Sequence, residues 1–413
     1  MREKKKFSIL QITLILIIAY SVMPIVARLF GMFFTTYAYL MVLIIAFFSI
    51  IVLRGQEIIH QVIGLILPMF MMEILIYVVT DPSLVLWVYV VILDLLPALL
   101  GYYIVHYENF TNLKVFVFAL FIIVAITIVT TIVGLQIYPN AARYLATVSD
   151  ANEEDNVLYN LMNIGGYEFV YTINFLYPAV IYGFKKKKIP LFIVIIYAIA
   201  DFFLILNSSY TIALLLFVAS TVLIFFKRDL KVAEIFLVLV LTIIFALMFF
   251  PLLSDLLLAL SKVIDNKDIS ERLAAMAGGK EGLDNLDDNR VELYMVSLDS
   301  IINSPIFGGM FKGTRVGGHS FIMDFVAQYG LLGLLALVFI YRAIYEKFYM
   351  PYKDTKGYGY IFWAYLQVLI ASLINTDMWL TVLTLFLPMI FAYFNHEKEN
   401  EYENIMDHKH RIA

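Results

Sequence analysis

A histidine and a serine follow paired glycines in the segment GGHSFIMDFVAQYG, residues 317–330. The imidazole of His319 titrates near neutral pH, so it could serve as a general base or a hydrogen-bond donor. An ordinary histidine at a membrane interface is the alternative interpretation. Asp324 lies five residues later. That spacing does not share a helix face well, yet Asp324 could approach the same cavity.

The preceding segment DDNRVELYMVSLDSIINSP, residues 287–305, has the pattern of an amphipathic helix. Residues 287–289 are N-cap candidates, and Pro305 ends the helix. Apolar residues recur on one face at helical spacing: Val291, Tyr294, Met295, Leu298, Ile301 and Ile302. We expect this helix to lie against a membrane-embedded bundle or its outer surface.

Arg290 falls in the first turn of the predicted helix. The free backbone N–H groups and the helix dipole favour an anion there. A guanidinium beside them adds a bidentate grip on phosphate or carboxylate. A local salt bridge with Asp287 or Glu292 is the alternative.

Five glycines lie in SPIFGGMFKGTRVGGHS, residues 304–320, interleaved with Lys312, Arg315 and His319. Glycine allows the backbone to approach a ligand or another chain closely. It equally suits a plain flexible loop. Acidic residues outnumber basic ones over residues 251–319, so any anion site here must be local.

The whole chain is 62% hydrophobic and 15% charged, whereas soluble domains are about half apolar and a quarter charged. Its long uninterrupted apolar runs predict an all-α integral membrane protein rather than a barrel. The chain has no cysteine and a net charge of −4. We therefore expect no thiol chemistry and no nucleic-acid partner, and the absence of a clustered ligand set predicts no metal.

The apolar runs divide one polytopic domain, residues 1–413, into about twelve spans. These are residues 8–27, 32–53, 59–79, 83–105, 113–135, 166–184, 189–206, 209–226, 232–250, 320–345, 358–375 and 377–394. The positive-inside rule places both termini and the lysine clusters, including KKKK at 185–188, in the cytoplasm. Two long loops are then external: residues 136–165 and, between spans nine and ten, residues 251–319 with the amphipathic helix.

The chain has six histidines, and this topology places all of them except His319 at or inside the cytoplasmic face. Arg143 is the lone basic residue of the first external loop, where it could pair locally or lean over the bundle as a second anion contact. Four acids fall inside apolar runs, where carboxylates serve either interhelical hydrogen bonding or ion coupling: Glu73, Asp94, Asp201 and Asp324. Glu168 lies near an outer edge.

The block NRVELY…SPIFGGM…GGHSFIMDFVAQYGLLGLL resembles the conserved block of the O-antigen ligase and polymerase superfamily, which includes bacterial capsule and exopolysaccharide polymerases. The family pattern is an arginine opening a helix, a glycine turn after proline, a histidine before a small polar residue, and Gly-Leu-x-Gly. The matching residues are Arg290, Pro305 with Gly308 and Gly309, His319 with Ser320, and Gly330 to Gly333. The usual His-Asn is His-Ser here. An arginine in an earlier external loop of the family could correspond to Arg143.

The resemblance implies a metal-independent glycosyltransferase without a cofactor, in the bacterial cytoplasmic membrane with its active site outside. It would transfer a glycan from a polyprenyl diphosphate carrier to the non-reducing end of another lipid-linked glycan. His319 would act on the acceptor hydroxyl. Arg290 and Arg143 would hold the diphosphate, helped by Lys312 or Arg315, and Tyr294 and Ser320 would contact substrate. Partners would be the lipid-linked oligosaccharide, the bilayer, and flippase and chain-length regulator proteins.

Two alternatives stay open. A ligase would use the same site with a different acceptor. A twelve-span secondary transporter or flippase is the rival from another class. Its commonest form joins two six-span halves by a long cytoplasmic loop, whereas the junction after span six here is only KKKKIP.

Overall fold

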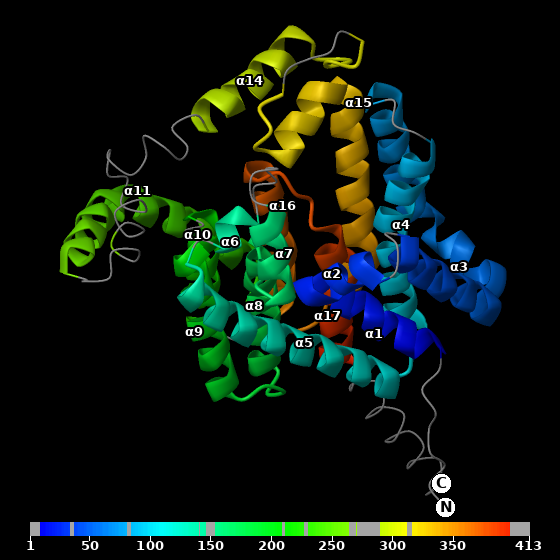
Figure 1. Cartoon of the computed structure of the whole chain (residues 1–413), viewed down its shortest axis with the longest axis horizontal. Coiled ribbons are helices and arrows are strands. Elements are labelled where there is room, and N and C mark those ends of the chain that lie inside the picture. Colours follow the sequence, from blue (N-terminus) through cyan, green and yellow to red (C-terminus); the bar gives the residue numbers. More distant parts are fainter. Residues whose placement is uncertain are drawn as a thin grey trace, which may run out of the picture.

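The computed structural model describes residues 9–33, 37–80, 84–139, 141–145, 153–208, 211–226, 230–263, 270, 290–311 and 316–396. Every regular element in these ranges is helical, which confirms the predicted all-α fold (Figure 1).

The N-terminal half forms α1 (Ile9–Val22), α2 (Pro24–Phe33), α3 (Tyr37–Thr80), α4 (Leu84–Tyr107), α5 (Phe110–Ile137), α6 (Ala141–Tyr144), α7 (Glu153–Leu161) and α8 (Tyr167–Lys185). The C-terminal half forms α9 (Leu191–Ser208), α10 (Thr211–Val222), α11 (Val232–Val263), α14 (Arg290–Asn303), α15 (Phe321–Ile344), α16 (Tyr358–Ile374) and α17 (Leu387–Asn395). Short π and 3₁₀ turns extend α15 to Tyr352, and a π turn at Val382–Phe386 leads into α17.

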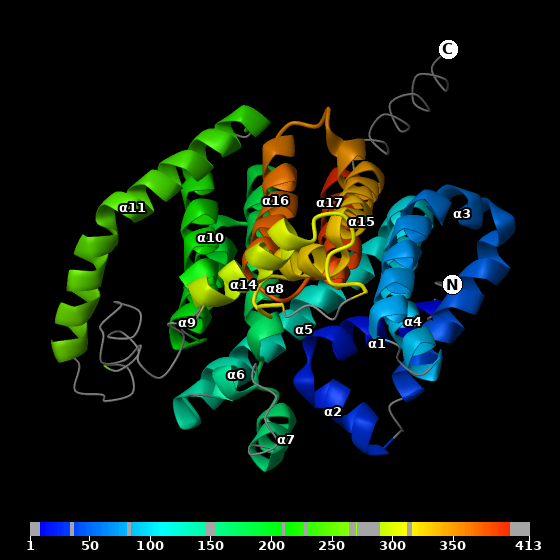
Figure 2. The same ribbon diagram turned by 90° about the horizontal axis from the view of Figure 1, so that it is seen from above.

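Within the described residues, three helices are long and apolar enough to cross a membrane: Phe110–Ile137, Leu191–Ser208 and Phe321–Tyr352. The first predicted span is instead two helices, α1 and α2, bent by 105° at a break before Pro24. Proline disfavours helical backbone in the residue before it, which explains the break at Met23. The second and third predicted spans form one long curved helix, α3 (Figure 2). The number of spans therefore stays a prediction.

Large apolar side chains form an exposed stripe along α5: Phe118, Ile122, Ile126, Val129 and Val133. Soluble monomers rarely expose a continuous apolar surface of this kind, which marks a membrane or protein contact. By contrast, α8 is buried at every residue from Phe169 to Gly183 and packs against α9, α10, α16 and α17. The chain is thus a helical bundle around α8 whose periphery suits lipid.

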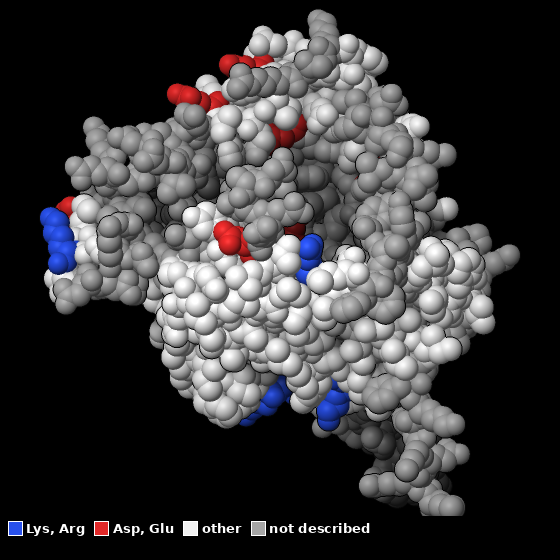
Figure 3. Space-filling view, in the orientation of Figure 1, with Lys and Arg blue, Asp and Glu red and all other residues white. Residues whose placement is uncertain are grey.

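The α8–α9 connection and α14 lie at opposite ends of the bundle (Figure 1). The described Lys and Arg atoms visible in Figure 3 lie at the lower edge, at the left edge and near the centre of the molecule. The placement of the lysine cluster at residues 185–188 and of the amphipathic helix on opposite sides of a membrane stays a prediction.

Helix α14 begins at Arg290, ends at Asn303 and packs on α15, as the sequence predicts. Its predicted apolar face does not turn fully inward, because Met295 is 48% exposed and Ile302 is 66% exposed. The residue that it buries completely is Ser297. A buried hydroxyl needs hydrogen-bond partners, and Ser297 has them in Asp324 of α15 and Gly317 of the preceding loop.

The turn after α14 docks into a break in α15 at Gly330, which has φ 61° and ψ −144°. In a regular helix the Leu331 N–H would donate to the Ala327 carbonyl. Here Leu331 N donates to the Pro305 and Ile306 carbonyls (2.9 and 3.0 Å), and Ala327 O accepts from Gly309 N (3.0 Å). The turn therefore satisfies both backbone groups that the break releases.

Polar side chains fix the start of α8 against α5. Asn163, in left-handed backbone at φ 56°, donates to Thr130 Oγ1 (2.9 Å). Gly165 N donates to Thr131 Oγ1 (2.8 Å). Asparagine adopts this backbone more readily than most residues. The two bonds set the position of Glu168 in the first turn of α8.

The docked turn gives a test of the fold. Gly308 has φ +56°, and an added Cβ would lie 2.5 Å from the Ala327 carbonyl oxygen. We expect Gly308→Ala to lower the free energy of unfolding by at least about 1–3 kcal/mol, because the strained backbone alone costs that much. Thermal unfolding of the detergent-purified protein measures it. Gly64→Ala is the control, since no atom lies within 4 Å of its added Cβ. Equal midpoints for the two variants would contradict the docking.

Candidate functional site

Two of the predicted site residues, Tyr294 and Ser320, meet at the last turn of α16. The final carbonyls of a helix lack intrahelical donors and need other partners. Ser320 Oγ donates to Leu373 O (2.5 Å), Tyr294 Oη donates to Ile374 O (2.7 Å), and Phe321 N donates to Asn375 O (2.7 Å). Helix α14, the loop before α15 and the start of α15 are thereby held on one helix end.

Asp324 accepts hydrogen bonds from both α14 and the loop before α15. Its Oδ2 accepts from Ser320 N (3.0 Å), while Oδ1 accepts a hydrogen bond from the Ser297 hydroxyl. Ser297 Oγ in turn accepts from Gly317 N (2.9 Å). Asp324 thus joins α14 to the loop carrying His319. Charge-assisted hydrogen bonds of this kind are the stronger ones, so the residue has a structural role in the first turn of α15.

Ser320 is fully buried, and it caps α15 by accepting from Met323 N (3.1 Å). Its hydroxyl is therefore engaged as both donor and acceptor. The Tyr294 hydroxyl is likewise bonded to α16. Both residues shape the site by positioning its loops, and neither presents a free hydroxyl.

His319 is half-buried between Gly318 and Ser320, and its ring makes no hydrogen bond to any residue that the structure describes. The glycines before it serve different purposes. A Cβ on Gly317 would lie 2.0 Å from the Leu293 carbonyl oxygen, so the loop passes directly over α14. Gly318 has φ +78° and open space around it. The imidazole is consequently presented on a loop that is tied down on both sides.

Two adjoining cavities have volumes of about 630 and 600 Å³, and the second reaches Phe321, the residue that follows this loop. They share wall residues from the α1–α2 bend, the start of α8 and the connection after α16: Tyr20, Ser21, Ala27, Glu168, Thr376 and Asp377. One also reaches Leu145, just after α6, and the other reaches Phe321. Pockets for small ligands hold about 300–1,000 Å³, so each of the two cavities is of ligand size.

The cavities therefore connect two predicted regions. Arg143 belongs to α6, two positions before Leu145, and His319 lies two positions before Phe321. The side chains of Arg143 and Arg290 lie outside the described part, although both backbones are helical, and Lys312 and Arg315 lie outside the described residues altogether.

Asp377 is a site residue that the sequence pattern did not single out. It lies in the connection between α16 and the last helix, where its Oδ1 accepts from Trp379 N (3.1 Å). Its carboxylate interacts electrostatically with that of Glu168. The sequence does hold a signal for this residue, because Asp377 is an acid at the boundary of two apolar runs, in NTDMW at 375–379.

The other membrane acids have separate settings. Asp201 on α9 is fully buried, and neither carboxyl oxygen has a hydrogen-bond partner among the described residues. Glu73 on α3 is fully buried and lines the cavity that reaches Phe321. The side chain of Asp94 lies outside the described part. Among described residues, no three His, Cys, Asp or Glu side chains group closely enough to hold a metal ion.

A third cavity, of about 610 Å³, lies at the other end of the bundle and is lined by Lys185, Lys187 and Lys188. Lys185 Nζ donates to the Ile224 and Phe226 carbonyls (2.5 and 2.6 Å). None of the predicted site residues is among the described wall residues of the three cavities. The cavity that reaches Phe321 comes nearest to His319 along the chain, so it is the candidate site. No protein-family model matches the chain, and no curated protein matches it.

The Ser297 contacts give a test of how the loop is held. We expect Ser297→Ala to leave the Gly317 N–H without its acceptor, at a cost of about 1–3 kcal/mol for a buried group. Hydrogen exchange at Gly317 and Ser320 should then accelerate by about tenfold or more. Asp299→Asn is the matched control, because Asp299 is exposed on the same helix. Unchanged hydrogen exchange at Gly317 and Ser320 in Ser297→Ala would show that Ser297 does not hold this loop.

Proposed function

We propose that this protein is a polysaccharide polymerase of the bacterial cytoplasmic membrane. It transfers a glycan from a polyprenyl diphosphate carrier to the non-reducing end of another lipid-linked glycan at the outer face. The observation that carries the proposal is the placement of His319. Its ring has no hydrogen-bond partner among the described residues. Its loop is held by Ser297, and Phe321, two positions later, lines a ligand-sized cavity.

The chemistry needs a base for the acceptor and cations for the leaving group. The acceptor hydroxyl oxygen attacks the anomeric carbon of the donor glycan, and its proton passes to His319. The bond from that carbon to the diphosphate oxygen breaks, and the electron pair leaves with the diphosphate. Arg290 and Arg143, with Lys312 and Arg315, stabilise this charge, which is where preorganised cations accelerate a reaction most. A single displacement inverts the anomeric centre.

The surface around α14 suits a lipid-borne substrate. Apolar side chains on α14 and on the turn after it are exposed: Met295, Leu298, Ile302, Ile306, Phe307 and Phe311. Amphipathic helices with such faces lie in the interface of a bilayer. A polyprenyl diphosphate has its charged group at that depth, so the carrier would reach Arg290 without leaving the membrane.

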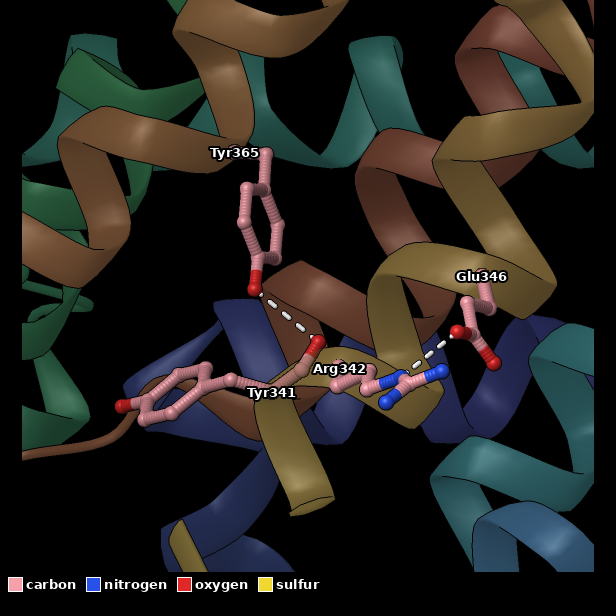
Figure 4. A network of polar contacts seen from close by, with 4 residues as sticks. All are labelled: Tyr341, Arg342, Glu346 and Tyr365. Carbon is pink, nitrogen blue, oxygen red and sulfur yellow. Dashed lines mark hydrogen bonds and ion pairs between the residues drawn. The ribbon is translucent and has the colours of Figure 1, made fainter. Parts of the chain in front are cut away.

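The first test removes the reacting groups. We expect His319→Ala and Arg290→Ala each to abolish polymer, leaving single repeat units on the carrier, because the base or the diphosphate contact is lost. Gel sizing of the surface polysaccharide measures this. Arg342→Ala is the control, since Arg342 is an exposed residue at the far end of α15 paired with Glu346 at 2.7 Å (Figure 4).

The products separate the alternatives. Full-length polymer from both variants would refute the site. Polymer that stays on its carrier without reaching its final acceptor would indicate a ligase. Repeat units left at the cytoplasmic face would indicate a transporter.

The absence of cysteine gives a test of orientation. We expect Asp299→Cys to react with a membrane-impermeant maleimide in intact cells, because α14 is external in the proposed topology. Lys187→Cys should react only after the cells are opened. The cysteine-free parent chain provides the background. Labelling of Lys187→Cys but not Asp299→Cys in intact cells would reverse the topology and exclude the polymerase.

A further inference from the structure

The cavity that reaches Phe321 carries groups that the proposed reaction does not use: the carboxyls of Glu168 and Asp377, and the indole of Trp379. We propose that they form the acceptor subsite, which binds the terminal sugar of the acceptor glycan through its hydroxyl or amino groups and rejects sugars bearing a negative charge. This inference rests on the proposed function, whose acceptor it defines.

The wall of the cavity has the composition that sugars require. Carboxyl oxygens accept hydrogen bonds from hydroxyl and ammonium groups, and aromatic side chains provide flat apolar surface for a sugar ring. Glu168 is exposed to the cavity. Aromatic wall residues from four different segments accompany the two acids: Tyr20, Tyr167, Phe321 and Trp379.

Trp379 points to a ligand independently of the acids. It is only 5% exposed, and its buried indole N–H has no acceptor among the described residues. A buried donor without an acceptor costs about 1–3 kcal/mol. Trp379 also holds an unfavourable backbone conformation at φ 47°. Its ring is fixed against Tyr171 and Phe175, with centroids 5.2 and 5.0 Å away. A sugar oxygen in the cavity would supply the missing acceptor.

The backbone places this subsite next to the catalytic histidine. Phe321 N donates to Asn375 O (2.7 Å), so Thr376 and Asp377 follow directly from the segment that touches the His319 loop. A sugar held by Asp377 and Trp379 would therefore lie at the end of the cavity that Phe321 lines, two positions along the chain from His319.

Charge then separates the two substrates. The donor brings a diphosphate, which any ionised carboxylate of the Glu168 and Asp377 pair repels and the basic residues at 290 and 143 attract. Like-charge juxtaposition is an effective way to exclude a wrong partner. The same repulsion excludes acceptors ending in a uronic acid or a phosphorylated sugar from the acidic subsite.

Binding of a soluble sugar tests the subsite without requiring turnover. The probe is the repeat-unit oligosaccharide released by hydrolysis from the host's surface polysaccharide, compared with the same oligosaccharide oxidised at its primary hydroxyls to uronates. Calorimetric titration into the nanodisc-embedded full chain measures both dissociation constants. We expect wild type to prefer the unoxidised form by about tenfold or more, a difference of about 1.4 kcal/mol.

The variants assign that preference to residues. Combined Glu168→Gln and Asp377→Asn should weaken binding of the unoxidised probe about tenfold and remove the discrimination. Asp201→Asn is the control, because Asp201 is a buried acid that does not line either cavity. Equal binding of both probes by wild type, or wild-type affinity in the double variant, would overturn the subsite.

The two proposals fail in different ways. Polymer made by His319→Ala cells would refute the polymerase whatever the binding results are. Unaltered binding in the correctly folded Glu168→Gln and Asp377→Asn chain would refute the subsite and leave the polymerase standing. Circular dichroism and gel filtration of each variant confirm folding, and the single variants provide a second measurement if the double variant does not fold.

Discussion

The exchange of backbone hydrogen bonds at Gly330 is the constraint on which the site depends. The break in α15 releases the N–H of Leu331 and the carbonyl of Ala327, and the turn at Pro305–Gly309 takes up both. Unpaired backbone groups in apolar surroundings cost several kcal/mol each. The break and the turn therefore stabilise one another. A side chain at either Gly308 or Gly330 would clash with the backbone of the other segment. Because the turn directly follows α14, this contact also fixes the helix that begins at Arg290.

A second exchange of the same kind organises the other side of the site. The end of α16 offers carbonyls without intrahelical donors, and Tyr294, Ser320 and Phe321 satisfy three of them in succession. Asp324 and Ser297 then hold the loop between α14 and α15. The outcome is a rigid loop with one half-buried histidine ring that these contacts leave unused. Such preorganisation suits a residue that must meet a sugar hydroxyl in one orientation.

The sequence pattern predicted several local features because each follows from short-range chemistry. The helix from Arg290 to Asn303 follows from apolar spacing and from Pro305. The close approach at Gly308 and Gly317 follows from glycine itself. The spans were less predictable. A proline break divided the first, and the second and third fused into α3, since hydropathy measures apolar length and does not determine where a helix bends or continues.

By itself, the sequence determined that the chain is an all-helical, cysteine-free, apolar protein with one histidine-bearing loop between a predicted amphipathic helix and a long apolar helix. Composition and spacing are local properties, so they are readable without a fold. Only the tertiary structure decided what Asp324 does, since its partner Ser297 lies on another helix. It also brought Glu168 and Asp377 to one cavity from opposite halves of the chain. Long-range pairing of this kind depends on how helices pack, and that information is spread over every contact between them rather than held in any one motif.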